Sequence, residues 1–364
     1  MPMSSKERVH IALSHEKSDR VPCNALFVPE IQETLAARLG IDYNVPEGEP
    51  ALATDLVCRI GAQLGNDMVK VQAGMESMFY IPSDKEEYVS TWGVKMRRAQ
   101  NETGIYTENI GGPLEGDDVL LDRYSIPDPL DPSVYTAPAR IIKDWGKDFW
   151  TVGSVQISIF EAAAHLRGLP KLMMDMIDNK DYANVLFDKV MQYPLLAAGE
   201  FIKLGADMIW CGDDVAMQTG MMISLDMWRE FFRPRYAAMF EDWKKINPRV
   251  KIAYHSDGNC EMILDDMIEI GLDVINPIQP SCMEPGKIKK RYGKNLCLFG
   301  GVDIQYTMPF GTIGELEQEI KYLCEICGEG GGFIISPSHY LQSDTSVEKV
   351  LKYYEFVKRY GQYR

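Results

Sequence analysis

The sequence predicts an α/β fold: a (β/α)8 TIM barrel formed as a single domain over residues 1–364. Eight short apolar runs, rich in β-branched residues and bounded by turn residues, follow one another along the chain, with helical patterns between them. Most of the runs are uniformly apolar rather than alternating, which is typical of parallel strands covered on both faces. Eight βα units in alternation are what such a barrel requires, and the chain length suits one.

The expected strands are, in order, 21–28, 67–72, 149–157, 207–212, 251–256, 273–278, 296–303 and 333–338. Among the helical patterns, 260–273 carries an amphipathic stripe and stops at Gly271. The pattern 312–328 opens with the capping-box spacing of Thr312 and Glu315. The pattern 224–247 contains Pro234, which should kink the helix or end one helix and start another.

A long insertion, 75–148, separates the second and third expected strands. Within it, the runs 88–98 and 104–112 are expected to pair as a two-stranded excursion, and a Pro-rich stretch, 125–138, follows. We interpret the insertion as a flap at one end of the barrel, not as a second domain.

Charge and composition narrow the classes of function. The formal net charge of −15 opposes binding to nucleic acid and to anionic membrane surfaces. No stretch of about eighteen apolar residues and no signal-peptide pattern is present, so a cytoplasmic protein is expected. The eight cysteines are scattered and predict free thiols, and we interpret Cys324 and Cys327 as buried thiols. The glycine-rich 328–332 precedes a strand, which is the wrong order for a phosphate-binding loop.

Polar residues follow the expected strands at their C-terminal ends, where the active site of such a barrel lies. They are Gln72, Glu161 and His165, Asp213 and Asp214, His255, Asp257 and Asn259, Gln279, Asp303, and His339 with Tyr340. Three of the five histidines belong to this set. The other two, His10 and His15, are expected at the surface.

His255, Asp257 and His339 are the strongest candidates for chemistry. His255 and Asp257 stand two apart at one strand end, so both side chains can point to the same side, and His339 comes from another strand end. Two imidazoles and a carboxylate form a recognised three-ligand set for a catalytic Zn²⁺ with one open position. A histidine acting as general acid or base with its neighbouring acid, and a polar layer without chemistry, are the alternatives.

The sequence gives weaker support for a functional role of the other polar residues near the strand ends. Glu161 and His165 share one face of the helix after the third strand. Glu161 is a favourable charge at the helix N-terminus, and a role as fourth ligand or substrate anchor is the alternative. Arg167 is a candidate clamp for a carboxylate, and a solvated surface arginine is the alternative. Asp213 and Asp214 would face opposite ways, and we favour Asp214 as the one that faces the barrel mouth.

An ordered series of segments resembles the uroporphyrinogen decarboxylase superfamily. These segments are KERVHIALSHEKSDRVP, FEAAAHLRG, WCGDD, YHSDGN, VINPIQP, RYGKNLCLFGGVD and GGGFIISPSHYLQ. The likeness spans almost the whole chain and implies a (β/α)8 barrel. True uroporphyrinogen decarboxylases carry an arginine-rich motif of the form PxWxMRQAGR that grips substrate carboxylates, but the corresponding VPCNALFVPEIQ contains no arginine. Uroporphyrinogen is therefore not the expected substrate.

The second half of the chain resembles the corrinoid-dependent methyltransferase branch. That branch binds zinc through a His-x-Cys pair after strand five and a cysteine after strand eight, and the matching positions are His255, Asp257 and His339. Nitrogen and oxygen ligands leave zinc a harder Lewis acid, which suits an oxygen-linked methyl donor such as a methoxylated aromatic. The resemblance therefore implies an O-demethylase methyltransferase that uses zinc and passes the methyl group to a Co(I) corrinoid.

The same resemblance suggests roles for the remaining residues. Asp214, Glu161 and Tyr340 are the expected catalytic groups, and His165, Arg167, Asn259, Gln279 and Asp303 are the expected substrate-binding groups. Since no segment resembles a corrinoid-binding module, the cofactor is expected on a partner protein. That protein would dock over the barrel mouth against the insertion and the loop of Met217, Met221 and Met222. The sequence is also compatible with a homodimer.

Two other functions stay open at this point. One is a metal-free decarboxylase or lyase for a smaller acid, with His255 and Asp214 as acid and base. The other is a non-catalytic protein that binds a tetrapyrrole or a corrinoid.

Overall fold

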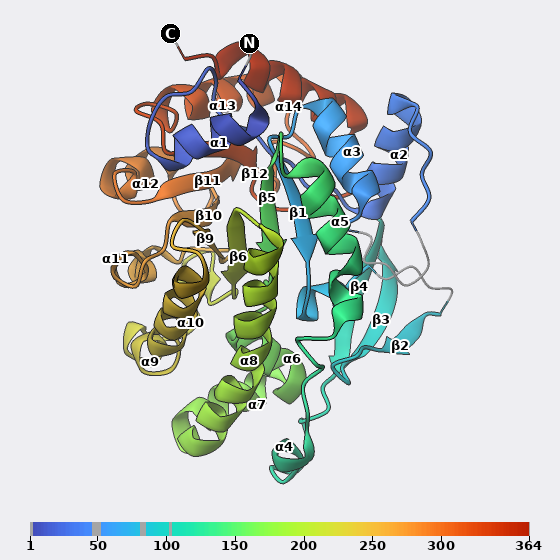
Figure 1. The fold of residues 1–364 in the computed structure, drawn as a ribbon, viewed down its shortest axis with the longest axis vertical. Helices are drawn as coiled ribbons and strands as arrows, with labels where there is room; N and C mark the ends of the chain where they lie inside the picture. The colour runs from blue at the N-terminus through green and yellow to red at the C-terminus, as the bar shows by residue number, and fades with distance from the viewer. Residues whose placement is uncertain (1–2, 46–51, 81–84, 102–103, 364) are drawn as a thin grey trace.

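A curled, fully parallel sheet forms the wall of the barrel in the computed structural model, which describes residues 3–45, 52–80, 85–101 and 104–363 (Figure 1). Its strand order is β1-β5-β6-β9-β10-β11-β12. The strands are β1 (Met68–Gln72), β5 (Trp150–Ser154), β6 (Met208–Gly212), β9 (Lys251–His255), β10 (Val274–Ile278), β11 (Cys297–Val302) and β12 (Phe333–Pro337). The α/β class and the barrel-like fold predicted from the sequence are confirmed.

The first expected strand, 21–28, is not a regular strand. It makes isolated parallel bridges from Cys23 to Ile335 and from Phe27 to Leu341, and it lies between β12 and β1. The reason is local: Pro22 has no N–H to donate, and the side chain of Asn66 bonds both the N–H and the C=O of Ala25, replacing ladder partners. The segment thus fills the eighth position of the barrel without a continuous ladder.

Helices surround the sheet (Figure 1). They are α2 (Pro29–Leu39), α3 (Asp55–Leu64), α5 (Thr136–Trp145), α6 (Phe160–Arg167), α7 (Leu169–Asp178), α8 (Lys180–Leu204), α9 (Leu225–Phe231), α10 (Arg233–Ile246), α11 (Leu264–Glu269), α12 (Pro285–Tyr292), α13 (Ile313–Ile326) and α14 (Val347–Tyr360), with the 3₁₀ turn η3 (Glu261–Ile263). The expected pattern 224–247 forms two helices, and Pro234 stands in the first turn of the second. The capping box of Thr312 and Glu315 opens α13 as predicted.

Helix α1 (Ser5–Leu13) lies across the N-terminal end of the barrel, near both chain termini (Figure 1). Its Val9 and Leu13 join a buried cluster with inward residues of the strands, among them Met68 and Trp150. This end is therefore closed by apolar packing. Further along the strands the inward side chains become polar, with Lys70, Ser154, His255, Asn276 and Ser336 all buried. Buried polar side chains inside the barrel therefore lie toward its C-terminal end, where the active sites of such barrels are found.

The insertion forms a three-stranded antiparallel sheet: β2 (Glu87–Val89), β3 (Lys95–Asn101) and β4 (Gly104–Gly111). Two strands were predicted; the run 88–98 instead turns back on itself because Ser90–Gly93 forms a tight turn with Gly93 at φ 75°. The insertion also holds η1 (Met75–Met78), α4 (Leu120–Arg123) and η2 (Pro132–Tyr135), and residues 81–84 and 102–103 lie outside the described part. The hairpin β7 (Ala216–Met217) and β8 (Gly220–Met221) follows β6.

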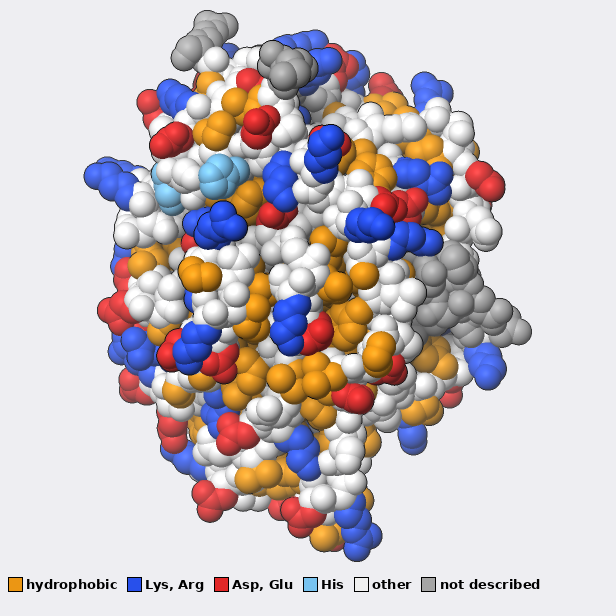
Figure 2. Space-filling model, viewed as in Figure 1, with side chains coloured by type: hydrophobic (Ala, Val, Ile, Leu, Met, Phe, Trp, Pro, Cys, Tyr) orange, Lys and Arg blue, Asp and Glu red, His pale blue; other side chains and the backbone are white. Residues whose placement is uncertain are grey.

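Surface and cysteine predictions can also be compared with the structure. All eight cysteines are free, and Cys324 and Cys327 are buried, as predicted. Acidic and basic side chains are interspersed over the face shown in Figure 2, so that face carries no patch of a single sign. None of the helices in the described ranges combines the length and the apolar character needed to cross a bilayer.

Candidate metal centre and adjoining cavity

The structure brings His255, Asp257 and His339 together at the C-terminal end of the barrel. His255 is the last residue of β9, Asp257 lies two residues beyond it, and His339 lies two residues beyond the end of β12. One ligand atom from each side chain lies within 4.8 Å of the others. His255 Nε2 and Asp257 Oδ1 are 3.8 Å apart. The three groups converge from two strand ends, which the sequence had predicted for a metal site.

Asn276 determines which nitrogen of His255 faces the site. His255 Nδ1 lies 2.7 Å from Asn276 Oδ1, and Asn276 Nδ2 donates to the carbonyl of Phe299 at 3.3 Å. Because the amide nitrogen is engaged by that carbonyl, the amide oxygen accepts from Nδ1–H of His255. The Nε2 lone pair then faces Asp257, as a metal ligand requires.

The residues present fit a zinc ion. His255 Nε2 is buried and has no hydrogen-bond partner in the described part of the chain, which is costly for a polar atom unless a ligand satisfies it. Ligand atoms at the usual zinc distance of about 2.0–2.2 Å in a tetrahedral site lie roughly 3.3–3.6 Å apart, so side-chain movements of about 1 Å would bring all three onto one ion. Cys260, three residues beyond Asp257, does not belong to this group of converging ligand atoms in the described part of the chain.

Asp214 and Asp213 have different surroundings. Asp214 Oδ1 lies 3.8 Å from His255 Nε2 and accepts the backbone N–H of Asp257 at 2.7 Å. Asp213 is fully buried and accepts from the backbone N–H groups of Ile159 and Glu161 and from Tyr236 Oη. Asp214 is thus the one that borders the site, while Asp213 fixes the start of α6.

Glu161 lies behind Asp214. Its Oε2 accepts the backbone N–H of Asp214 at 2.9 Å. Burial raises the pKa of Glu161 well above its ordinary value, and the charges of Asp214 and Asp213 raise it further. Burial also raises the pKa of Asp214. These carboxyl groups therefore form a buried acidic cluster beside His255, Asp257 and His339.

His165 and Arg167, both on α6, lie in different surroundings. His165 lines an open cleft with Glu161 and Asp214, and burial lowers its pKa to about 4, so its imidazole is neutral at pH 7. Arg167 is fully buried. It pairs with Asp175 at 2.8 Å and with Asp118, and donates to the carbonyl of Leu114. The predicted role of Arg167 as a substrate clamp is wrong, because its guanidinium is used within the fold.

The remaining expected substrate-binding residues bond to the loops that carry them. Gln279 Oε1 accepts the backbone N–H of Gly258 at 3.0 Å and so holds the segment that bears Asp257. Asn259 Oδ1 accepts from the N–H of Glu261. The Asp303 carboxylate accepts backbone N–H groups of the turn that follows it, from residues 305, 306 and 307. The structure brings none of the three into the cavity described below.

A buried network missed by the sequence analysis lies deeper in the barrel. Lys70 Nζ donates to Glu76 Oε1 and, at 2.7 Å, to Tyr340 Oη. Ser154 Oγ donates to Glu76 Oε2 at 2.6 Å, and Tyr340 Oη donates to Oε1 of the same carboxylate at 3.3 Å. Tyr340 therefore faces this ion pair. Lys70 could have indicated this network from the sequence alone, because a lysine within an apolar strand must have a buried partner.

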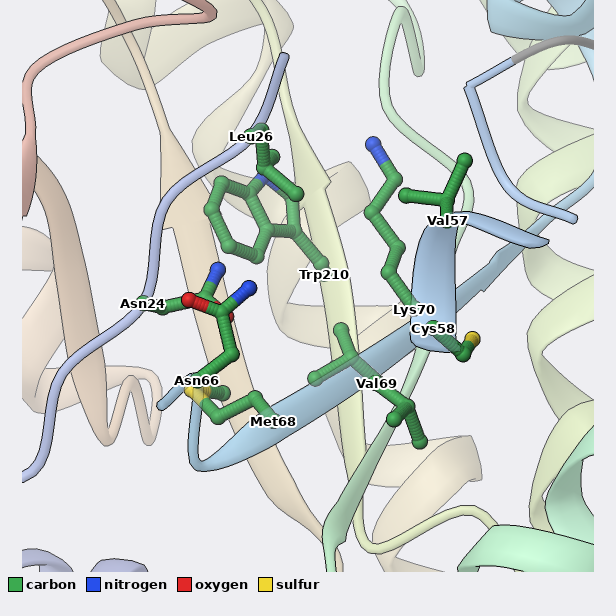
Figure 3. Close-up of a pocket in the computed structure, with 10 residues that line it drawn as sticks. Asn24, Leu26, Val57, Cys58, Asn66, Met68, Val69, Lys70 and Trp210 are labelled. Carbon is green, nitrogen blue, oxygen red and sulfur yellow. The ribbon is translucent and has the colours of Figure 1, made fainter. Parts of the chain in front are cut away.

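A cavity connects this network with the metal ligands. Its lining includes Lys70, Trp210, His255, His339 and Tyr340. It adjoins the pocket of Figure 3, where Lys70 from β1 and Trp210 from β6 extend toward the same end and the Trp210 ring lies beside Leu26. Asn24 and Leu26, from the irregular segment 21–28, border both spaces.

A comparison with known protein families identifies the family of this chain. A family model of uroporphyrinogen decarboxylase (URO-D) matches residues 4–360. The chain belongs to this family. The resemblance found in the sequence is thus confirmed over nearly its whole length. A comparison with curated proteins finds no match.

Solved structures similar to this URO-D family member include a methyltransferase from Methanosarcina mazei, with TM-score 0.74 and 21% identity over 98% of this chain and 99% of that chain. Weaker likenesses are to an α-amylase from Geobacillus thermoleovorans (TM-score 0.39, 12% identity, 70% and 72% covered) and to xylanase 10B from Thermotoga maritima (TM-score 0.38, 10% identity, 66% and 81% covered). At this identity the first likeness shows a shared fold.

Proposed function

We propose that this protein is a methyltransferase that moves a methyl group from an oxygen-linked donor, a methoxylated aromatic, to the Co(I) corrinoid of a partner protein. The observation that carries the proposal is the convergence of His255, Asp257 and His339 around a buried imidazole nitrogen without a partner. These three residues would hold a zinc ion with one position open. The M. mazei neighbour, a methyltransferase, supports the same reaction class.

Zinc bound there would supply a Lewis acid that draws electron density from the donor oxygen. The surrounding residues have separate tasks. Asn276 holds the His255 ring in the orientation that a ligand needs. Asp214 holds the backbone of Asp257 in place. Glu161, whose pKa is raised by burial, is the candidate to deliver a proton to the departing oxygen.

The proposal needs a surface for the corrinoid protein. Loops after β6 and β11 meet at the barrel mouth, where Gln218 Nε2 donates to Gln305 Oε1 at 3.2 Å. On these loops the side chains of Met217, Tyr306 and Phe310 are 55%, 56% and 71% exposed. Large exposed apolar side chains beside a site are typical of contact surfaces, which supports docking of the partner here.

The direct test is transfer to cobalt. The zinc-loaded protein is incubated with a reduced corrinoid protein and a panel of methoxyarenes, methanol and methylamines, and the Co(I) to methyl-Co(III) spectral change is followed. We expect the change with a methoxyarene, and its loss in the His339→Ala variant. Absence of the change with every donor and with several corrinoid proteins would reject the function.

Membership of a family named for a decarboxylase keeps one alternative open, a metal-free decarboxylase or lyase acting on a smaller acid. His255 and Asp214 would then act as acid and base. This alternative requires no zinc and full activity after treatment with a chelator. Elemental analysis of protein purified without oxygen, followed by chelation, separates the two reactions.

A further inference from the structure

A cleft between the insertion and α6 has room for an aromatic ring beside the candidate metal centre. Its volume is about 500 Å³, whereas the cavity lined by His255 and His339 has about 20 Å³, which is space for roughly one water molecule. Asp214 and Glu161 line the cleft, and Asp214 Oδ1 lies 3.8 Å from His255 Nε2. The cleft therefore extends to the edge of the candidate metal centre.

Hydrogen bonds hold the two walls of the cleft together. Asn109 on β4 donates through Nδ2 to the carbonyl of His165 on α6 at 3.1 Å, and the N–H of Leu114 donates to the carbonyl of Leu166 at 2.9 Å. The lining also includes apolar side chains, those of Ile110, Phe160, Ala164, Leu169 and Met222. The cleft thus offers fixed apolar surface to a flat ring.

His165 presents a hydrogen-bond donor to this cleft. Asn109 Oδ1 accepts the N–H of Gly111 at 2.8 Å, so the NH₂ of Asn109 faces His165 Nδ1, 3.0 Å away. Because Nδ1 accepts, the imidazole is uncharged and its proton is on Nε2. The other ring contact of His165 in the described part of the chain is with the apolar ring of Phe79. Nε2–H is therefore left to bond a ligand oxygen.

The charged side chains that line the cleft are all acidic. They are Glu115, Glu161 and Asp214, and no lysine or arginine joins them in the described ranges. A bound zinc ion would be balanced by the carboxylates of Asp257 and Asp214, so it would not make the cleft cationic. An anionic ligand would lose hydration here without a cation to pair with. The lining therefore favours an uncharged ligand.

We propose that this cleft takes the ring of an uncharged methoxylated aromatic, and that His165 donates a hydrogen bond to a second oxygen on that ring. The methoxy group would then lie on the side of the cleft that Asp214 and Glu161 border. The inference rests on the proposed function, because it takes the ligand to be the methyl donor. It adds the charge class of that donor and a residue that selects it.

Calorimetric binding to the zinc-loaded protein at pH 7, without any corrinoid protein, tests the charge class. Two probes of nearly the same shape are compared, 4-methoxybenzenesulfonate and the uncharged methyl 4-methoxyphenyl sulfone. A sulfonate is a weaker metal ligand than a carboxylate, so zinc does not mask the comparison. We expect the sulfone to bind about tenfold more tightly. Equal affinity, tighter binding of the sulfonate, or no binding of either probe would overturn the proposal.

A second pair of probes tests the hydrogen bond from His165. The hydroxyl group of 2-methoxyphenol is uncharged at pH 7, and methoxybenzene lacks a second oxygen. We expect the phenol to bind about fivefold more tightly than methoxybenzene. His165→Phe should remove this advantage while methoxybenzene binds as before. His10→Phe, on α1 at the opposite end of the barrel, is the matched control and should keep it. An advantage that survives in His165→Phe would overturn the role of His165.

A filled cleft locates the binding site. Ala164→Phe places a large side chain in the lining and should abolish binding of all four probes. Ala37→Phe, at an exposed position of α2, is the matched control and should bind them like wild type. Unchanged binding in Ala164→Phe would overturn the assignment to this cleft. The two wild-type comparisons still decide the charge class and the preference for a second oxygen if a variant does not fold.

This binding test and the methyl-transfer test fail separately. Binding of uncharged probes with no methyl transfer would reject the proposed reaction and leave the cleft as their site. Methyl transfer from anionic and uncharged donors alike, with equal affinities, would reject the charge class and leave the reaction in place.

Discussion

At the scale of single residues, the hydrogen bond between His255 and Asn276 decides what the histidine can do. Nδ1 lies 2.7 Å from the amide oxygen, and this leaves Nε2 buried and without a partner. A general base would use the same lone pair, so the hydrogen bond alone does not select metal chemistry. The proximity of Asp257 and His339 favours the proposed metal site, because the three side chains together offer a set of ligands that zinc uses.

Loss of either histidine should abolish zinc binding. In His255→Ala and His339→Ala, two protein ligands remain, and we expect a zinc content well below that of wild type after dialysis against a weak chelator. His10→Ala, an exposed histidine on α1 at the opposite end of the barrel, is the control and should bind zinc like wild type. Full zinc content in one of the site variants would remove that histidine from the centre.

Asn276, which bonds the ring of His255, should affect zinc affinity almost as strongly as the histidine itself. Asn276→Ala removes the acceptor that fixes the His255 ring, and we expect zinc affinity to fall about 10–100-fold, as measured by competition with a chromophoric chelator. Asn259→Ala is the matched control, since that amide bonds the N–H of Glu261. Equal zinc affinity in Asn276→Ala and wild type would show that the ring orientation has another cause.

At the scale of elements, Arg167 joins the insertion to the barrel. From the end of α6 it reaches Asp175 on α7, and Asp118 and the carbonyl of Leu114 in the insertion. The pairing lies entirely within the fold, so the sequence, which showed an arginine near a strand end, could not separate this role from substrate binding. The partners are 8 to 53 residues away along the chain.

Arg167→Met should therefore affect stability more than zinc binding. It removes the 2.8 Å partner of the buried Asp175 carboxylate and leaves only Lys171 at 3.9 Å, and we expect the free energy of unfolding to fall by about 3 kcal/mol in urea titrations. Arg97→Met, which breaks exposed pairs on β3, is the control and should change stability little. An Arg167→Met protein as stable as wild type would contradict the structural role.

At the scale of the whole molecule, the sequence predicted the barrel and the ligand triad for the same reason. Uniformly apolar runs identify parallel strands, and polar residues at their ends must meet at one rim. Lys70 and Asn276 lie inside such runs, where the pattern assigns them to the core, so their roles required the structure. The segment 21–28 has the apolar composition of a strand, but Pro22 and the side chain of Asn66 replace its ladder.

The stability of the molecule should depend on pH through His165. Burial lowers its pKa from 6.5 to about 4, so the unfolded chain binds a proton more readily. The resulting contribution, up to about 3 kcal/mol, is present above pH 6.5 and is lost as the pH falls toward 4. Urea unfolding at pH 7 and pH 4.5 should show a smaller loss for His165→Gln than for wild type. The same loss in both proteins would contradict this assignment.

The most direct test of the central claim is X-ray absorption at the zinc edge, on protein loaded with one equivalent of zinc. The account predicts a first shell made of nitrogen and oxygen alone at about 2.0–2.1 Å, with the outer-shell scattering of two imidazoles. That scattering should be absent from the His255→Ala, His339→Ala double variant. Sulfur in the first shell, or the same spectrum in the double variant, would contradict a centre built from His255, Asp257 and His339.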